Sequence, residues 1–220
     1  RREAEQWIEA GIVKVNGKVV HSPALNVTEA DVIVADGQTL LEREPTRMWL
    51  YHKPAGLMTT HKDPEGRPTV FAALPKTMPR VISVGRLDLN SEGLLLLTND
   101  GALARKLELP SNGWIRKYRV RAYGNIPAAM LVEMKKGVVA DGVHYGSVDA
   151  VIDSKQGGNT WLTVSLKEGK NREIRKIFEH FDCKVSRLLR ISYGPFILGK
   201  LERGEVKEVP KKMLESFVGK

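Results

Sequence analysis

The stretch Val-Gly-Arg-Leu-Asp-Leu-Asn-Ser-Glu-Gly-Leu-Leu-Leu-Leu-Thr-Asn-Asp-Gly, residues 84–101, holds an aspartate, Asp88, between two leucines. The run Leu94 to Leu97 predicts a buried strand, and residues 90–93 predict the turn that leads into it. Asp88 would then lie at the rim of that strand, where a carboxylate needs a partner to stay ionised. From these residues alone, a turn-forming aspartate is the favoured interpretation of Asp88, and it is sufficient for Asp100.

Outward from this stretch, the signals after residue 47 are mostly those of strands, at residues 48–51, 94–98, 118–123, 160–166 and 185–193. Helical patterns occur at 127–136 and 171–181. In the second helix, Ile174, Ile177, Phe178 and Phe181 recur at the spacing of one buried face. Clustered strands with a few helices predict an α+β domain whose sheet is mixed or largely antiparallel.

The N-terminal part is a separate small unit of helix and sheet. Residues 1–10 have helical spacing, Asn16-Gly17 predicts a hairpin turn within 13–20, and residues 31–34 predict another strand. Residues 42–47 are charged, include Pro45 and have no apolar side chain, so they predict a linker. We therefore expect a small domain at 1–43 and a larger one at 44–220.

Composition favours a globular protein that binds a polyanion. The 220 residues are 42% hydrophobic, with no apolar run near the roughly 18 residues of a membrane span. Lys and Arg outnumber Asp and Glu by 35 to 26, which gives a net charge of +9. Such a balance favours nucleic acid as the partner. The alternative, a charge that only confers solubility, stays open at this point.

The cysteine and histidine content excludes several kinds of site. One cysteine, Cys183, cannot form an internal disulfide, which fits a bacterial cytoplasm, and the five histidines have no ligand-like spacing. No metal site is expected, and the absence of a long apolar run predicts no membrane span. The chain starts at Arg1 without a methionine, so we expect that preceding residues are missing.

Two basic regions are candidate phosphate contacts. Residues 167–176 hold five basic residues at a junction from strand to helix, and Arg172 and Arg175 would lie at the helix start, which favours anions. The alternative for Arg175 is a surface pair with Glu179. In the N-terminal unit the candidates are Arg1, Arg2, Lys14 and Lys18, and the alternative is a solvated face.

Taken together, these motifs resemble the RsuA/RluB branch of bacterial ribosomal RNA pseudouridine synthases, most closely its large-subunit members. Residues 85–88 with 93–101 resemble the catalytic motif of that family, and residues 13–20 resemble the end of an S4 RNA-binding domain. Further matching stretches are Lys53-Pro54-Ala55-Gly56, Lys117-Tyr118-Arg119-Val120, residues 168–176 and residues 186–190. An S4 domain should also have a helix before Arg1 that packs on Trp7 and Ile8.

The resemblance implies the synthase fold, with a central mixed sheet, and a set of site residues. Asp88 would be the nucleophile and Arg175 its cationic partner. Tyr118 would be the residue whose ring stacks on the flipped base and whose hydroxyl helps to move a proton. Leu188 is our choice over Leu189 for the apolar wall. The substrate-binding candidates are Arg86, Leu188, Lys170, Arg172 and Lys53. Basic residues expected to hold RNA outside the pocket are Arg1, Arg2, Lys14, Lys18, Lys170, Arg172, Lys176, Lys184, Arg187 and Arg190.

By this resemblance the chain is expected to isomerise one uridine of ribosomal RNA, 23S rather than 16S, as a cytoplasmic monomer without a cofactor. A synthase specific for the small subunit is one alternative. Another is a non-catalytic S4-type RNA-binding or ribosome-assembly protein, which would not need Asp88, Tyr118 and Arg175 together. A hydrolase or phosphotransferase built on Asp88 and Asp100 lacks a metal site or phosphate loop in the sequence.

Overall fold

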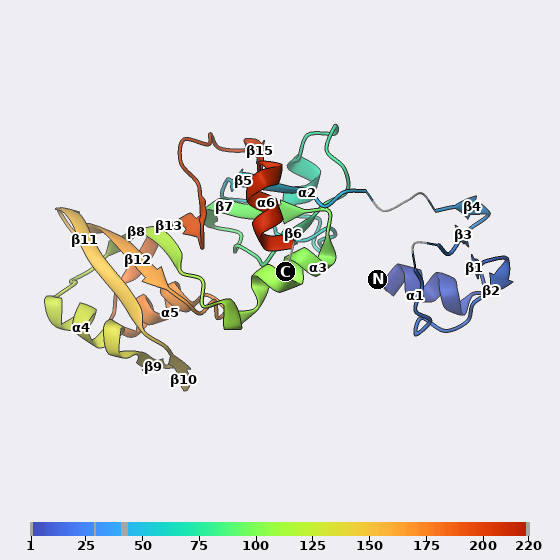
Figure 1. Ribbon diagram of the computed structural model, residues 1–220. Coiled ribbons are helices and arrows are strands. Elements are labelled where there is room, and N and C mark those ends of the chain that lie inside the picture. The colour runs from blue at the N-terminus through green and yellow to red at the C-terminus, as the bar shows by residue number, and fades with distance from the viewer. Residues whose placement is uncertain (1, 29, 41–43, 219–220) are drawn as a thin grey trace. The chain divides into compact units, whose positions relative to one another are not determined.

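The computed structural model describes residues 2–28, 30–40 and 44–218 (Figure 1). The chain divides into two compact units, residues 1–45 and 46–220. Each unit has its own sheet. The expected boundary after residue 43 falls next to residues 41–43, which lie outside the described part of the chain.

The N-terminal unit is one helix and a four-stranded antiparallel sheet. Both hairpin turns have two consecutive residues with positive φ, at Asn16-Gly17 and at Asp36-Gly37. That conformation is what a two-residue turn between twisted strands requires. The strand predicted at 31–34 begins two residues later than expected, at Ile33. In the helix, the side chain of Trp7 is 39% exposed. The elements are α1 (Arg2–Glu9), β1 (Val13–Val15), β2 (Lys18–Val19), β3 (Ile33–Ala35) and β4 (Gln38–Thr39), with strand order β2-β1-β3-β4.

The larger unit is built on a mixed nine-stranded sheet within the described residues. Its principal order is β11-β12-β8-β13-β7-β5-β15, with β14 beside β13 and β6 beside β7. Its strands are β5 (Met48–Lys53), β6 (Ile82–Val84), β7 (Ser91–Thr98), β8 (Arg116–Tyr123), β11 (Val148–Gln156), β12 (Asn159–Leu166), β13 (Lys184–Tyr193), β14 (Phe196–Ile197) and β15 (Val206–Glu208). A separate hairpin pairs β9 (Val138–Ala140) with β10 (Val143–Tyr145). The helices are α2 (Val70–Ala73), α3 (Gly101–Glu108), η1 (Pro110–Asn112), α4 (Ala128–Lys136), α5 (Glu173–His180) and α6 (Lys211–Val218).

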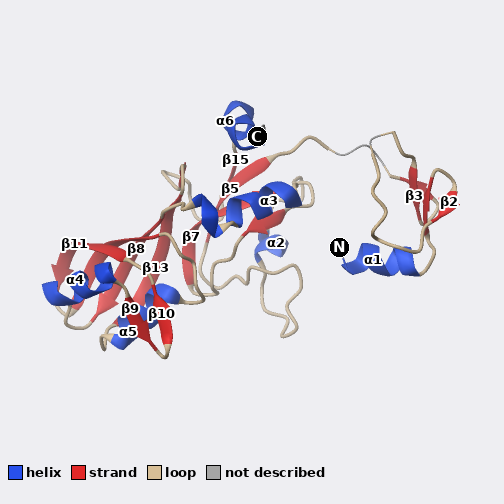
Figure 2. Ribbon diagram, turned by 60° about the horizontal axis from the view of Figure 1, so that its bottom comes forward, coloured by secondary structure: helices blue, strands red, loops and turns tan. Residues whose placement is uncertain are grey.

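Different helices pack on different parts of this sheet. Helices α4 and α5 lie on one side of β11, β12, β8 and β13, where a buried apolar cluster joins them (Figures 1 and 2). Strand β7 is buried on both faces. Leu94 and Leu96 pack in a cluster with α3 and α6, whereas Leu95 and Leu97 pack in a cluster with α2. The leucine run that predicted a buried strand therefore serves two cores, and the α+β prediction with a mixed sheet is confirmed.

The two halves of the sheet meet where β13 runs parallel to β7. Leu188, Leu189 and Arg190 pair there with Ser91, Glu92 and Gly93, while the other pairs along the sheet are antiparallel. Gly93 has φ of +101°, and a Cβ at this position would lie 2.3 Å from the carbonyl oxygen of Arg190. Only glycine allows the two strands to approach this closely.

Three local predictions are corrected. Residues 91–93 belong to β7, and the turn lies earlier, closed by the Ser91 amide donating to the Asp88 carbonyl at 3.0 Å. Asp100 is not a simple turn residue, because its carboxylate accepts from the amides of Ala102 and Leu103 and caps α3. Pro127 precedes α4 instead of opening it. Within the described residues, no helix has the length and apolarity to cross a membrane.

Candidate active site

A cavity of about 810 Å³ lies in the larger unit, beside the parallel junction of β13 and β7. Among the segments that contribute to its wall are the loop between β6 and β7, the start of β8, strand β13, and the loop before α5. From the predicted set it collects Arg86, Asp88, Tyr118, Lys170, Arg172, Leu188 and Arg190. Segments that are far apart in the sequence thus place a carboxylate, an aromatic ring and several cations around one space.

Asp88 is half-buried in the short loop between β6 and β7. Its main chain is held by the Ser91 amide and by the ammonium group of Lys53, which donates to the Asp88 carbonyl at 3.1 Å. Asp88 lines the cavity, and its main chain is tied to the sheet. Such an arrangement fixes the position of an acidic group that lines a cavity.

Lys53 has a different role from the predicted one. Its side chain is fully buried at the end of β5, so it cannot touch a substrate in the cavity. Its ammonium group donates to four main-chain carbonyls, of Pro54, Asp88, Leu89 and Ser91, at 2.8 to 3.2 Å. Burial lowers the pKa of Lys53 from 10.5 to about 8, against the opposing effect of Asp88 and Glu92. Lys53 therefore anchors the loop of Asp88 instead of binding substrate.

Arg175 also contacts this loop, again through carbonyl groups. Its guanidinium donates to the carbonyls of Val185 at 2.9 Å and Asn90 at 3.2 Å. Among the described residues it forms no ion pair with Asp88 within 4.0 Å, and the two groups interact only at longer range. Burial and the neighbouring Arg172 lower the pKa of Arg175, and Asp88 opposes this shift. The structure thus shows Arg175 positioning the turn, without the direct pair that was expected with Asp88.

Tyr118 and Leu188 line the cavity from neighbouring strands. Tyr118 is half-buried on β8, and Leu188 is 6% exposed on β13. Successive residues of a strand point to opposite faces, so Leu189 packs in the cluster with α3 and α6. The cavity wall is accordingly Leu188 and not Leu189.

The loop before α5 brings basic groups to the cavity. Arg172 is exposed and has a left-handed backbone, with φ of 51°, which is uncommon for a residue with a side chain. Lys170 forms an ion pair with Glu168 at 2.8 Å and donates to the His144 carbonyl at 2.6 Å. Arg86, in the loop between β6 and β7, is exposed and also lines the cavity. The cavity therefore receives cationic groups from more than one segment of the chain.

The remaining basic candidates are dispersed. Lys176 is half-buried on α5, Lys184 is exposed, and Arg187 forms an ion pair with Glu92 at 2.8 Å. Arg190, expected outside the pocket, is 3% exposed and lines the cavity. In the N-terminal unit Lys14 and Lys18 are exposed on β1 and β2. Arg1 and the side chain of Arg2 lie outside what the structure describes.

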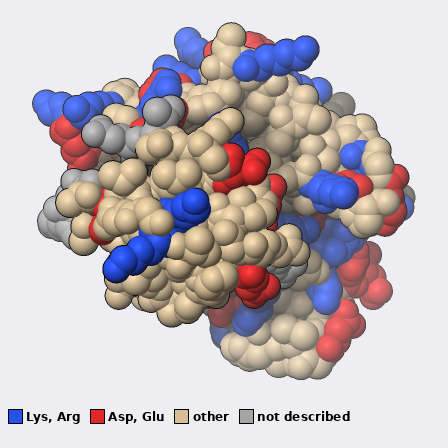
Figure 3. All heavy atoms as spheres, turned by 90° about the vertical axis from the view of Figure 1, so that its right-hand side faces the viewer, with Lys and Arg blue, Asp and Glu red and all other residues tan. Residues whose placement is uncertain are grey.

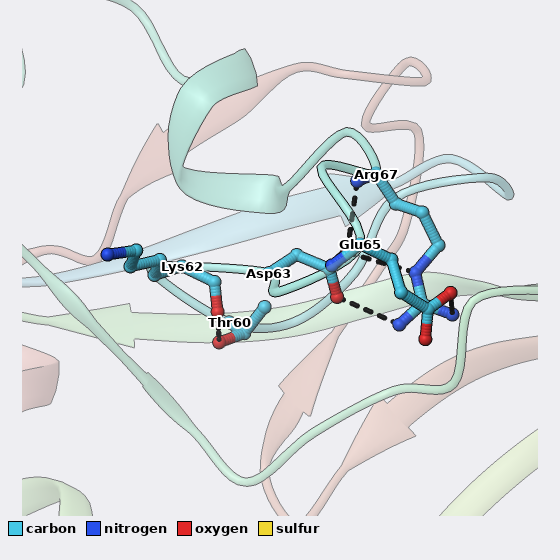
Figure 4. A network of polar contacts seen from close by, with 5 residues as sticks. All are labelled: Thr60, Lys62, Asp63, Glu65 and Arg67. Atoms are coloured by element: carbon cyan, nitrogen blue, oxygen red, sulfur yellow. Dashed lines mark hydrogen bonds and ion pairs between the residues drawn. The ribbon is translucent and has the colours of Figure 1, made fainter.

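A loop between β5 and α2 closes another part of the wall, through Thr59, Thr60 and His61. Figure 4 shows how the following residues are fastened, with the Asp63 carboxylate against the Arg67 side chain. Asp63 accepts from the Arg67 guanidinium at 2.8 and 3.1 Å and from the Arg67 amide at 3.0 Å. These bonds lower the pKa of Asp63 to about 2. The contact between Asp63 and Arg67 that holds this loop therefore persists at neutral pH.

Sequence reasoning missed several charged or polar residues of the wall, among them Arg116, Glu173 and Tyr193. Arg116 lies just before the strand predicted at 118–123, and extending that strand by two residues would have placed Arg116 on the same face as Tyr118. Glu173 is 4% exposed, and burial raises the pKa of its carboxyl group. Nothing in its surroundings in the sequence signals that burial.

In the space-filling view of Figure 3, basic and acidic side chains lie in small separate groups with other residues between them. Among the described residues, no group of three or more His, Cys, Asp or Glu side chains could hold a metal ion. The lining of the cavity, which combines a carboxyl group on a fixed main chain with an aromatic ring, an apolar side chain and several cations, suits a flat, uncharged group attached to an anion.

Known proteins resemble this chain in sequence and in fold. Residues 47–180 match the RNA pseudouridylate synthase family, and residues 1–33 match the S4 domain. A Rickettsia bellii protein named "Uncharacterized RNA pseudouridine synthase" is 52% identical over 213 residues, covering 97% of this chain and 92% of that protein. "Ribosomal large subunit pseudouridine synthase B" of Haemophilus influenzae is 42% identical, covering 95% of this chain and 60% of that protein.

A solved structure described as "Crystal structure of pseudouridylate synthase" matches with a TM-score of 0.73 over 99% of this chain and 93% of that one. At 23% identity, this likeness concerns the fold. The family match covers more than half of the chain, and the relatives align over nearly all of it. The chain therefore belongs to the RNA pseudouridine synthase family and carries an S4 domain at its N-terminus.

Proposed function

We propose that this protein converts one uridine of large-subunit, 23S ribosomal RNA to pseudouridine, with Asp88 as the nucleophile. The observation that carries the proposal is the meeting of Asp88, Tyr118 and Leu188 on the wall of one cavity. The ribosomal substrate is supported by the similarity to proteins named ribosomal large subunit pseudouridine synthase B, at 40 to 42% identity. The chain spans 48 to 60% of the length of those relatives.

In the proposed reaction the Asp88 carboxylate attacks C1′ of the target uridine, and the bond from C1′ to N1 breaks. The released uracil keeps that electron pair, turns within the cavity and attacks C1′ through C5, which releases the carboxylate. C5 then loses a proton and N1 gains one, so atoms and electrons balance and no cofactor is consumed. Covalent catalysis of this kind divides one difficult step into two easier ones.

Each neighbour of Asp88 has a defined part in this proposal. Tyr118 stacks on the flipped base, and Leu188 covers its other face. Arg175 and Lys53 keep the main chain of the nucleophile in place through the carbonyls that they contact. Arg175 also carries a charge within electrostatic reach of Asp88.

Flipping a uridine out of its stack costs a few kcal/mol, least where the RNA is already looped. Contacts of Arg86, Lys170 and Arg172 with the phosphates around the cavity would offset that cost. The S4 domain would add a separate RNA contact through Lys14 and Lys18, which are exposed.

The test is pseudouridine mapping on ribosomal RNA from cells that express the intact protein, the Asp88→Asn variant or no protein. We expect one 23S site to be modified with the intact protein and unmodified with Asp88→Asn, whose side chain has the same shape but cannot attack. Binding of the variant to 23S RNA should persist. A lost site in 16S RNA would point to the small-subunit alternative, and a map unchanged by deletion would favour a non-catalytic RNA-binding protein.

A further inference from the structure

Tyr193, on the wall of the cavity, is contacted by two arginines. The guanidinium carbon of Arg116 lies 4.7 Å from the centre of the Tyr193 ring, and that of Arg190 lies 5.1 Å from it. Arg116 Nη2 donates to the Tyr193 hydroxyl at 3.1 Å, and this hydroxyl donates to the Leu107 carbonyl at 3.1 Å. All of these except Leu107 line the cavity that holds Asp88. Two like charges are thus held at one ring.

Neither guanidinium is neutralised by an ion pair in the described part of the chain. Arg116 Nη1 donates to the carbonyls of Lys167 and Glu168, and Arg190 Nε donates to the Leu94 carbonyl at 2.7 Å. These contacts orient the two planar groups, but a carbonyl oxygen carries no net charge. The positive charge of the pair is left for another group to balance.

Arg190 makes the imbalance acute. Its side chain is 3% exposed, and its Nη2 has no hydrogen-bond partner among the described residues. A buried charge without a counterion costs free energy, and so does a buried donor without an acceptor. A phosphate oxygen would answer both needs, because the guanidinium fork fits phosphate geometry.

The carboxyl group of Glu173 does not fill this role. It interacts electrostatically with Arg116, without an ion pair within 4.0 Å between these two described residues. One of its oxygens accepts from the Lys170 amide at 2.9 Å, and the other has no partner in the described residues. Burial raises its pKa and so favours the neutral form. Among the described residues, the two arginines on the cavity wall therefore lack an anionic partner.

We propose that Arg116 and Arg190 form a phosphate subsite in the cavity of Asp88, occupied by a backbone phosphodiester of the RNA strand next to the reacting uridine. This assignment rests on the proposed function for the identity of the RNA. A flipped nucleotide carries its flanking phosphates toward the cavity, and the subsite fixes one of them. Arg116 and Arg190 thereby set how far the sugar enters toward the carboxylate.

The first test uses inorganic phosphate and the full chain. Thermal unfolding is followed at constant ionic strength, with chloride as the reference anion, for the wild type, Arg116→Gln, Arg190→Gln and the control Lys117→Gln. Lys117 is exposed and points to the other face of β8. We expect phosphate to raise the Tm of the wild type and the control above the value in chloride, and to have no such effect in either arginine variant.

An equal phosphate effect in the wild type and in Arg116→Gln would overturn the proposal and indicate general anion binding. If Arg190→Gln fails to fold, the half-buried Arg116 decides the outcome by itself. This readout needs no RNA and no turnover, so it stands apart from failure of the proposed function.

The second test separates RNA from free phosphate. A short looped RNA with one uridine is made with single uncharged methylphosphonates at each phosphate flanking that uridine. At one of these positions, we expect the wild type to bind the methylphosphonate RNA roughly tenfold more weakly than the unmodified RNA, which is the size of one charge-assisted contact. Arg116→Gln should bind the two RNAs equally. The same weakening in both proteins, or none in the wild type, would overturn the assignment to the RNA backbone.

Discussion

The ammonium group of Lys53 donates a hydrogen bond across 3.1 Å to the main-chain carbonyl of Asp88, from a side chain with no exposed surface. Lys53, the last residue of β5, thus holds the main-chain carbonyl of Asp88, a residue that lines the cavity. The main chain of Asp88 cannot move without disturbing the end of β5. The sheet therefore fixes the position of the candidate nucleophile.

Replacing Lys53 by Met should destabilise the protein by about 2–4 kcal/mol, because four carbonyls lose their shared donor in a buried place. Urea unfolding measures the change. The control is Lys62→Met, at an exposed position, where we expect a change within about 0.5 kcal/mol. Equal effects of the two substitutions would contradict the anchoring role.

The same group makes stability depend on alkaline pH. The pKa of Lys53 is about 8 in the folded protein and near 10.5 in the unfolded chain, so between these values the unfolded chain binds more protons. Stability contributed by this group therefore rises as pH increases through that window, and it is lowest below about 8. The free energy of unfolding of the wild type minus that of Lys53→Met should grow over this range. A difference that stays flat or falls would refute the assignment.

Gly93→Ala should cost about 2–4 kcal/mol, because the new methyl group would lie 2.3 Å from the Arg190 carbonyl in addition to the strain at φ of +101°. Gly66→Ala is the matched control, since Gly66 has φ of +70° with open space around it. Strain alone should cost this control about 1–2 kcal/mol. Urea unfolding of the two variants separates the steric effect from the conformational one, and equal losses would show that the close approach is unimportant.

Tyr118→Phe and Tyr118→Ala divide the proposed roles of that ring. Phe retains the stacking surface, so KM should stay near that of the wild type while kcat falls about 10²-fold through loss of the hydroxyl in proton transfer. Ala should raise KM as well, because stacking on the base is lost. Initial rates of pseudouridine formation give both values. Tyr123→Phe, at a ring that is 60% exposed, is the control, and a normal kcat for Tyr118→Phe would remove the hydroxyl from the mechanism.

Elements set by local chemistry could be predicted from the sequence. Asn16-Gly17 specifies its turn by positive φ, and the apolar spacing of α5 specifies which face is buried. These signals depend on neighbours within a few residues, which one sequence displays fully. For Asp88 the local residues favoured a turn, and only the family resemblance brought Asp88 and Tyr118 together in one site.

Features that depend on distant partners could not be predicted in this way. Residues 91–93 have the composition of a turn, yet pairing with β13 makes them a strand. A lysine and an arginine look alike on a surface and in a core, so the burial of Lys53 and Arg190 became visible only when their carbonyl partners were placed. The same holds for Arg175, whose acceptors are main-chain groups that carry no residue-specific signal.

The parallel pairing of β7 with β13 also determines when the cavity can exist. Residues 91–93 have to pair with residues 188–190, although strands β8 to β12 and helices α3, η1, α4 and α5 lie between them in the chain. Contacts of such long sequence separation form slowly, because a large loop is closed before any pairing is gained. During synthesis the N-terminal unit and strands β5 to β7 emerge well before β13. The S4 domain of a nascent chain can therefore fold before the cavity has formed.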